Sequence, residues 1–184
     1  MTVPAGGASA AIRPVTGEPV ISFADDFETD QGWSVTNNPD GGGTFDGGWE
    51  RGVPVGGGDR GDPASDFDGS GSAFLTDNED GNSDVDSGET ILTSPVIDLT
   101  GLDAPELSYA RWYDNSFGTA SAEDTMTVEV SDDGGATWAT LEVVGPDGSS
   151  ENPEVTGGWV ARSFVVSDFV SLTSSFRVRF RVSD

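Results

Sequence analysis

Two stretches of the chain alternate between apolar and polar residues with a period of two, which is typical of β-strands with one buried face. Residues 125–131 place a methionine and two valines on one face, and residues 176–182 place Phe and Val on one face and three arginines on the other. An Asp-Gly-Gly sequence at residues 133–135 predicts a hairpin turn, with residues 137–144 as the returning strand. The second half of the chain is therefore predicted to form antiparallel sheet.

The rest of the chain also favours short strands over helices. Glycine is abundant, at 26 of 184 residues, and it disfavours helices while marking turns. No helical period is found, and about ten short strands fit an antiparallel sandwich. Residues 1–19 are rich in Ala, Gly and Pro and are predicted to be a flexible lead or linker, with residues 20–184 as one domain. Further strands are predicted at residues 20–23, 32–36, 72–76, 89–93, 95–99, 107–113 and 159–166.

The charge of the chain limits its partners. There are 33 acidic residues against 8 basic ones, all arginine, so the net charge is −25. Such a chain repels nucleic-acid phosphates and anionic membranes. Two explanations remain open: the carboxylates bind a hard cation such as Ca²⁺, or the protein works in salt that screens its self-repulsion.

The absence of histidine and cysteine from the sequence limits its chemistry. Ser-His-Asp and Cys-His catalysis, zinc sites of the usual kind and thiol redox chemistry all need these residues. A glycosidase with two carboxylates is the catalytic alternative, but acidic residues are so common here that their spacing gives it little support. The chain is therefore predicted not to be an enzyme.

An acidic loop at residues 77–89 carries oxygen-bearing side chains on alternate residues, which can converge on one Ca²⁺. The loop is not an EF-hand, because Ser83 stands where the invariant glycine belongs and the flanking segments are strands. We interpret it as a calcium loop with Asp80, Asp84 and Asp86 as candidate ligands. The alternative is a solvated acidic turn.

A second acidic segment is Asp25-Asp26-Phe27-Glu28. Three carboxylates beside an aromatic residue repel one another, which costs stability unless a cation or arginine compensates. The arginines of residues 176–182 are candidate partners, and Asp25 and Asp26 are further candidate metal ligands. The alternative is an exposed turn.

Residues 131–138 read Ser-Asp-Asp-Gly-Gly-Ala-Thr-Trp and resemble the Asp box of sialidases and other extracellular β-proteins. We interpret the motif as a structural turn. Asp133 can satisfy backbone donors in its own turn, Gly135 can take a positive φ, and Trp138 can pack beneath the hairpin.

Two tryptophans suggest carbohydrate binding as a different function. Trp49 and Trp112 are candidate residues for stacking on a sugar ring, as in a carbohydrate-binding module. The alternative is that both side chains pack within the protein, as tryptophan more often does.

Several motifs occur in an order that resembles MAM-like jelly-roll domains, and more closely the jelly-roll modules of secreted bacterial peptidases. They are Asp26-Phe27-Glu28, Gly32-Trp33, Gly71-Ser72-Ala73-Phe74-Leu75, Leu92 to Leu99, Leu107-Ser108-Tyr109 and the strand before the Asp box. The resemblance implies an antiparallel two-sheet jelly-roll sandwich without catalytic residues. It also implies a metal site near Glu28, to which the acidic residues 84–86 contribute.

The resemblance also implies a strand after residues 176–182, so the sandwich is predicted to lack its last strand. Either that strand belongs to a longer polypeptide, or a partner chain supplies it. We therefore expect a secreted or cell-surface, calcium-binding accessory or adhesion module, with its parent polypeptide, a partner strand or a glycan as partner. The alternatives are a carbohydrate-binding module and a structural subunit of an extracellular filament or surface layer.

Overall fold

The computed structural model describes residues 20–41, 44–56, 60–81, 83–117, 123–146 and 154–184. The predicted lead segment at residues 1–19 lies outside this part of the chain. The strands are β1 (Ser34–Pro39), β2 (Trp49–Gly52), β3 (Ala73–Thr76), β4 (Gly88–Thr93), β5 (Glu106–Arg111), β6 (Thr125–Ser131), β7 (Ala139–Val144), β8 (Val160–Val165) and β9 (Arg177–Ser183). A short 3₁₀ helix, η1 (Val166–Asp168), follows β8.

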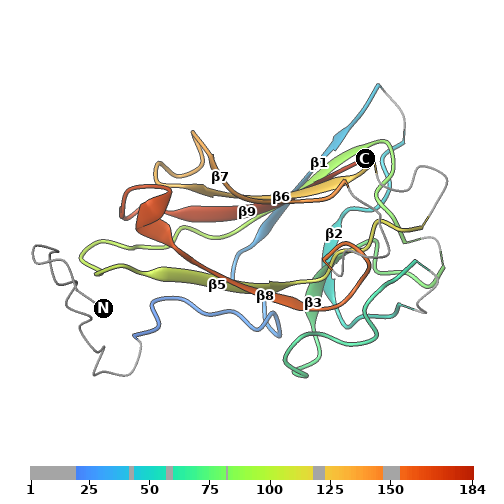
Figure 1. Cartoon of the computed structure of the whole chain (residues 1–184), viewed down its shortest axis with the longest axis horizontal. Coiled ribbons are helices and arrows are strands. Elements are labelled where there is room, and N and C mark those ends of the chain that lie inside the picture. The colour runs from blue at the N-terminus through green and yellow to red at the C-terminus, as the bar shows by residue number, and fades with distance from the viewer. Residues whose placement is uncertain (1–19, 42–43, 57–59, 82, 118–122, 147–153) are drawn as a thin grey trace, which may run out of the picture.

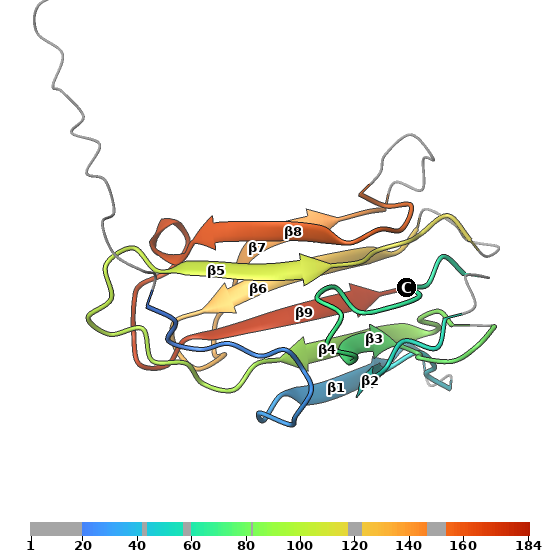
Figure 2. The ribbon, with the colours of Figure 1, turned by 90° about the horizontal axis from the view of Figure 1, so that it is seen from below.

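The strands form two layers (Figure 1). One layer is a five-stranded antiparallel sheet in the order β1-β4-β9-β6-β7. The other contains two antiparallel pairs, β2–β3 and β5–β8, which lie over different parts of the large sheet (Figure 2). The predicted all-β antiparallel sandwich is confirmed, and jelly-roll connectivity stays a prediction. The described residues contain no helix long and apolar enough to cross a membrane.

The core lies between the layers and is built from the inward residues of the two alternating strands. Val128 and Val130 of β6 are fully buried, and Val178 of β9 is nearly so. The polar residues of β6 are buried as well, which the alternation did not predict. The reason is that β6 lies between β9 and β7 and that Arg179 of β9 covers its outer face: Glu129 is only 8 % exposed and pairs with Arg179 at 2.7 Å.

A buried polar network links the two layers. Arg111 at the end of β5 is 4 % exposed and donates from Nη2 to Glu142 of β7 and to Glu154, both at 2.8 Å. Arg162 of β8 also pairs with both carboxylates, at 2.8 Å from Glu142. The Tyr109 hydroxyl donates to Glu142 at 2.6 Å. The two layers are therefore joined by charge-assisted hydrogen bonds as well as by apolar packing.

Two predicted strands are wrong. Residues 20–23 form no strand, and Val20 and Ile21 are 85 % and 73 % exposed. No described strand pairs with this segment, so its backbone has no ladder to join. Residues 95–99 form only a single bridge, between Ile97 and Phe176.

Candidate functional site

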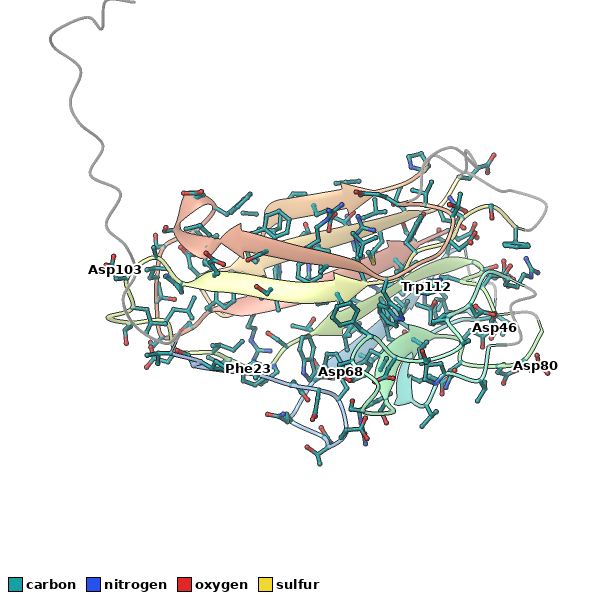
Figure 3. The ribbon with its side chains drawn as sticks, turned by 60° about the horizontal axis from the view of Figure 1, so that its bottom comes forward. Phe23, Asp46, Asp68, Asp80, Asp103 and Trp112 are labelled. Atoms are coloured by element: carbon teal, nitrogen blue, oxygen red, sulfur yellow. The ribbon has the colours of Figure 1, made fainter. Side chains whose placement is uncertain are left out.

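Six aspartates from distant parts of the sequence gather at one end of the sandwich, where β3 and β9 end and β4 and β6 begin. Each one raises the pKa of another member of the group or has its own pKa raised by other members. We call this group the acidic end: Asp46, Asp77, Asp84, Asp86, Asp124 and Asp184. Asp46 and the exposed Asp80 mark its position in Figure 3.

Backbone hydrogen bonds bring the segments of the acidic end together. Asp46 and Asp86 exchange two backbone bonds of 3.2 Å, which pairs the loop before β2 with the loop before β4. The Ser87 amide donates to Oδ2 of Asp184 at 2.9 Å, which ties the end of β9 to the same loop. The connections between strands therefore place carboxylates side by side that lie up to about a hundred residues apart in sequence.

The loop before β2 and the loop before β4 approach each other closely at Gly47. Gly47 has a φ of +85°, and a Cβ at this position would lie 2.1 Å from the backbone oxygen of Asp84. Only glycine fits this contact without a shift of the backbone. The Asp46–Gly47 turn is thus held directly against Asp84.

Burial and crowding raise the pKa of three members of the acidic end. Burial, followed by the charges of Asp46 and neighbouring glutamates, raises the pKa of Asp77 to about 6. Burial, followed by the charge of Asp184, raises the pKa of Asp124 to about 6. The pKa of Asp86 is raised by burial and then by Asp84, while Arg60 acts in the opposite direction. The charged form of these groups is therefore disfavoured in the folded state.

Asp84 lies at the centre of this crowding. Its Oδ2 pairs with Nη1 of Arg60 at 3.0 Å. Its Oδ1 is buried and has no hydrogen-bond partner among the described residues. A buried carboxylate oxygen without a donor lacks the hydrogen bond that water would give it in the unfolded chain.

The ligands available at this end are oxygens, which suit hard cations such as Ca²⁺. Within the described ranges, no group of three or more Asp, Glu, His or Cys side chains is arranged so that it could hold a metal ion. The donor chemistry of the acidic end therefore fits calcium, but its side chains are spread more widely than a closed site requires.

Glu28 belongs to a different acidic group, with Asp66. Its Oε1 accepts from the Ser72 amide at 2.5 Å and from the Ser70 hydroxyl at 3.2 Å. Oδ2 of Asp66, which is 7 % exposed, accepts from the same hydroxyl at 3.2 Å and from the Gly71 amide at 3.0 Å. Both carboxylates are thus stabilised by donors of one loop.

The two acidic groups lie apart. Asp68, which accepts from the Ser70 amide at 2.9 Å, lies well away from Asp46 and Asp80 in Figure 3. The structure gives Glu28 no partner in common with Asp84 or Asp86 among the described contacts. It therefore does not bring together the predicted ligands of one shared ion.

The remaining candidates at the start of the domain are used locally. Asp25 accepts from the Phe27 amide at 2.8 Å and from Nε1 of Trp33 at 2.9 Å. Asp26 accepts from the Glu28 amide at 3.2 Å. The expected pairing of this segment with the arginines of β9 is wrong, because those arginines pair within their own sheet: Arg177 with the Ser94 carbonyl, Arg179 with Glu129, and Arg181 with Glu89 and Glu129.

The Asp-box turn is held by its own side chains. Oδ1 of Asp133 accepts from the Thr137 amide at 2.9 Å and from the Ser131 hydroxyl at 2.7 Å. Gly135 has a φ of +99°, and Nε1 of Trp138 donates to its carbonyl at 3.0 Å. The Trp138 ring also lies 4.2 Å from the Arg179 guanidinium carbon, in cation–π geometry.

Replacement of Asp133 by alanine is expected to lower the melting temperature, because three hydrogen bonds that close the turn are lost. These hydrogen bonds also hold the pKa of Asp133 well below its usual value. The loss should therefore be larger at neutral pH than at pH 3, in thermal melts followed by circular dichroism, because below about 3.8 the unfolded carboxyl binds a proton while the folded one stays ionised. Asp132→Ala is the neighbouring control, because the side chain of Asp132 bonds the Ser171 amide instead of the turn. An equal loss at both pH values would contradict this role.

The two tryptophans proposed for sugar binding take part in the protein's own packing. Nε1 of Trp112 donates to the Gly61 carbonyl at 2.7 Å, and its ring meets the Trp159 ring edge-on at 5.7 Å. Trp49 is half-buried in β2, and its Nε1 is buried without a partner among the described residues. A shallow hollow of about 480 Å³ lies over β5 and β8, where Phe67 is 56 % exposed.

Sequence reasoning missed three members of the acidic end, Asp46, Asp124 and Asp184, and it placed Asp77 in the acidic loop without choosing it as a ligand. The three missed residues lie beside a strand or in a loop, where aspartates are ordinary. Their proximity follows from the strand order, for which the sequence offers no local signal. It also missed Asp66 as the partner of Glu28.

Fold and site together define an acidic all-β sandwich domain whose clustered functional groups are carboxylates. In comparisons with known proteins, no protein family matches this sequence, and no curated protein or solved structure matches it significantly. The resemblance to MAM-like jelly-roll modules therefore stays a prediction.

Proposed function

We propose that this domain is a non-catalytic, calcium-binding accessory or adhesion module of a secreted or cell-surface protein, and that the acidic end binds the ion. The observation that carries the proposal is the crowding of six aspartates around one ion pair, Arg60 with Asp84. Burial and then this repulsion raise the pKa of Asp77, Asp86 and Asp124, and a divalent cation would relieve the repulsion.

The free Oδ1 of Asp84 supplies the first ligand in this proposal. Ca²⁺ takes 6–8 oxygen ligands and accepts carbonyls and water along with carboxylates. Asp46, Asp86 and Asp184 are exposed and can turn toward Asp84 without crossing the core. Binding that favours the folded state would then stabilise the domain by mass action.

Calorimetric titration with CaCl₂ at pH 7 tests the proposal. The unmodified protein should give a saturable binding heat. The double variant Asp84→Asn/Asp86→Asn should lose most of it, since amides keep the shape of the ligands and remove their charge. Mg²⁺ should compete weakly, because it demands a tighter octahedral site.

Two controls separate the acidic end from other carboxylates. Glu28→Gln, in the second acidic group, should leave calcium binding unchanged. Asp103→Asn/Asp168→Asn removes the same number of charges from exposed positions outside both acidic groups and should have only a small effect. The proposal fails if no heat is seen, or if Glu28→Gln abolishes it while the acidic-end variant retains it.

A further inference from the structure

The hollow of about 480 Å³ lies on the outer face of the β5–β8 pair, and Figure 2 looks onto this face. Its floor consists of small side chains at facing positions of the ladder: Ser108 lies opposite Ser163, and Ala110 lies opposite Ala161. The volume falls within the range of small-molecule sites, about 300–1,000 Å³. Because the floor residues are small, a ligand in the hollow can lie close to the sheet.

An aromatic wall borders the hollow. Phe67 lines the hollow and is 56 % exposed. Its ring meets the Trp159 ring edge-on at 6.1 Å, and the Trp159 ring meets the Trp112 ring edge-on at 5.7 Å. Trp112 lies just beyond the end of β5 (Figure 3). The exposed Phe67 ring is thus supported from behind by two indoles.

Hydrogen bonds fix the loop that carries Phe67. Nε1 of Trp159 donates to the Ser65 carbonyl at 3.0 Å. Asp66, the residue before Phe67, is 7 % exposed and accepts from the Gly71 amide at 3.0 Å. The Phe67 ring is therefore held in place before a ligand arrives, which lowers the entropic cost of binding.

A chain of hydrogen bonds crosses the floor of the hollow. The Ser108 hydroxyl donates to Oγ of Ser163 at 3.0 Å, and the Ser163 hydroxyl donates to Oε2 of Glu106 at 2.9 Å. Since Ser108 donates its only hydroxyl proton within this chain, its oxygen can accept a hydrogen bond from a ligand. Hydrogen bonds in a chain also polarise and strengthen one another. The floor therefore favours a ligand that carries hydroxyl donors.

The lining of the hollow is almost uncharged, although the chain carries a net charge of −25. Among the described residues that line it, the charged one is Arg162, whose guanidinium pairs with Glu142 and Glu154. An anionic ligand would be repelled by the rest of the chain and would find its best partner here already engaged. A neutral ligand avoids both costs.

We propose that the hollow binds a neutral saccharide. The C–H face of a pyranose ring packs against the Phe67 ring, and a sugar hydroxyl donates to Ser108. Such a ligand combines apolar surface for the wall with donors for the floor. Phe67 thereby takes the stacking role that the sequence suggested for Trp49 and Trp112. The hollow and the acidic end share no described residue, so this proposal does not depend on calcium binding.

Titration with neutral sugars, followed by nuclear magnetic resonance in EDTA, tests the proposal. The probes are tetrasaccharides of β-linked glucose, galactose and mannose. At least one should bind and shift the amide signals of Ser108, Ala110 and Ala161, while the signals of the acidic end stay in place. The same tetrasaccharide with its hydroxymethyl groups oxidised to carboxylates should bind at least about tenfold more weakly.

Two variants identify the wall and the floor. Phe67→Ala should weaken binding about tenfold, because it removes the stacking ring. Ala161→Leu should abolish binding, because it fills the hollow from an exposed position without removing a contact. Phe169→Ala is the matched control, since this ring is 38 % exposed and packs on Phe164 outside the lining of the hollow, and it should bind normally.

Three results would overturn the proposal. The first is that none of the three neutral tetrasaccharides binds. The second is that the shifted signals of the unmodified protein lie away from β5 and β8, a result that does not depend on either variant. The third is that Phe67→Ala and Ala161→Leu, folded as judged by circular dichroism, both bind as well as the Phe169→Ala control.

Discussion

Replacement of Arg111 by methionine should lower the free energy of unfolding by about 3 kcal/mol, the largest effect we expect from a single side chain. Removal of one partner from a buried ion pair costs about 3–5 kcal/mol, because the other charge stays buried without compensation. The lower end of this range applies because Arg162 remains paired with Glu142. For a domain of this size the melting temperature should fall by about 6–12 °C.

The geometry of Glu142 explains why the loss is large. Burial alone would raise its pKa, but hydrogen bonds from Arg111, Tyr109 and Arg162 outweigh burial and hold its pKa below the ordinary value. The Arg111 side chain is 3 % exposed and that of Glu142 is 11 % exposed, so water cannot replace the lost donors easily. The substitution also removes one of the ion pairs that join the two layers of the sandwich.

Arg181→Met is the matched control for Arg111→Met. The side chain of Arg181 is 38 % exposed and lies 3.5 Å from Glu89. Exposed pairs of this kind contribute about 0.2–1 kcal/mol. Chemical denaturation of both variants distinguishes the two environments. Equal losses would show that the Arg111 network is no stronger than a surface ion pair. A double variant with Glu142 also made apolar should recover part of the stability, since no buried charge is then orphaned.

The part of this structure that follows local rules could be predicted from the sequence. Strict alternation predicted β6 and β9, and the Asp-Gly-Gly turn predicted the β6–β7 hairpin, because these features depend on neighbours along the chain. Residues 20–23 have the same apolar character but form no strand. Whether such a segment pairs depends on a distant strand beside it.

In the candidate site, too, only the residues that are close in sequence could be predicted to lie together. The acidic loop was found because Asp84 and Asp86 are close in sequence. Asp46, Asp124 and Asp184 join them only through strand order. The buried Arg111 network has a weak local signal, because Arg111 occupies an inward position of β5 together with Leu107 and Tyr109. The contacts of Glu28 with Ser70 and Ser72 were not predicted, because they depend on a loop more than forty residues away in sequence.

Stability in the absence of divalent ions should rise as the pH falls from about 7 to about 4.5, the opposite of ordinary acid sensitivity. The pKa of Asp77 and of Asp124 is about 6 in the folded protein, against the ordinary 3.8. Between these values the unfolded side chains are ionised while the folded ones keep their proton. The folded state therefore binds more protons in this window, so protonation favours folding.

Burial is the largest cause of both raised pKa values, and the charges that add to it come from several segments around the two carboxylates. Those that face Asp77 are Asp46, Glu79, Glu50 and Asp84, and those that face Asp124 are Asp184, Asp84, Asp86 and Glu123. Both groups remain partly in contact with water, so screening reduces their combined penalty at pH 7 to about 2 kcal/mol. The melting temperature in EDTA should thus be about 4–8 °C higher at pH 4.5 than at pH 7.

The trend should reverse below about pH 4, because carboxylates with lowered pKa values in the folded state, such as Asp133 and Glu142, take up protons first in the unfolded state, which favours unfolding. The double variant Asp77→Asn/Asp124→Asn should be more stable than the unmodified protein at pH 7 and should flatten the slope between pH 4.5 and 7. Asp103→Asn/Asp168→Asn removes the same charge from exposed positions and should leave the slope in place. If the unmodified domain instead melts at a higher temperature at pH 7 than at pH 4.5 in EDTA, the carboxylates of the acidic end do not repel one another as their positions require.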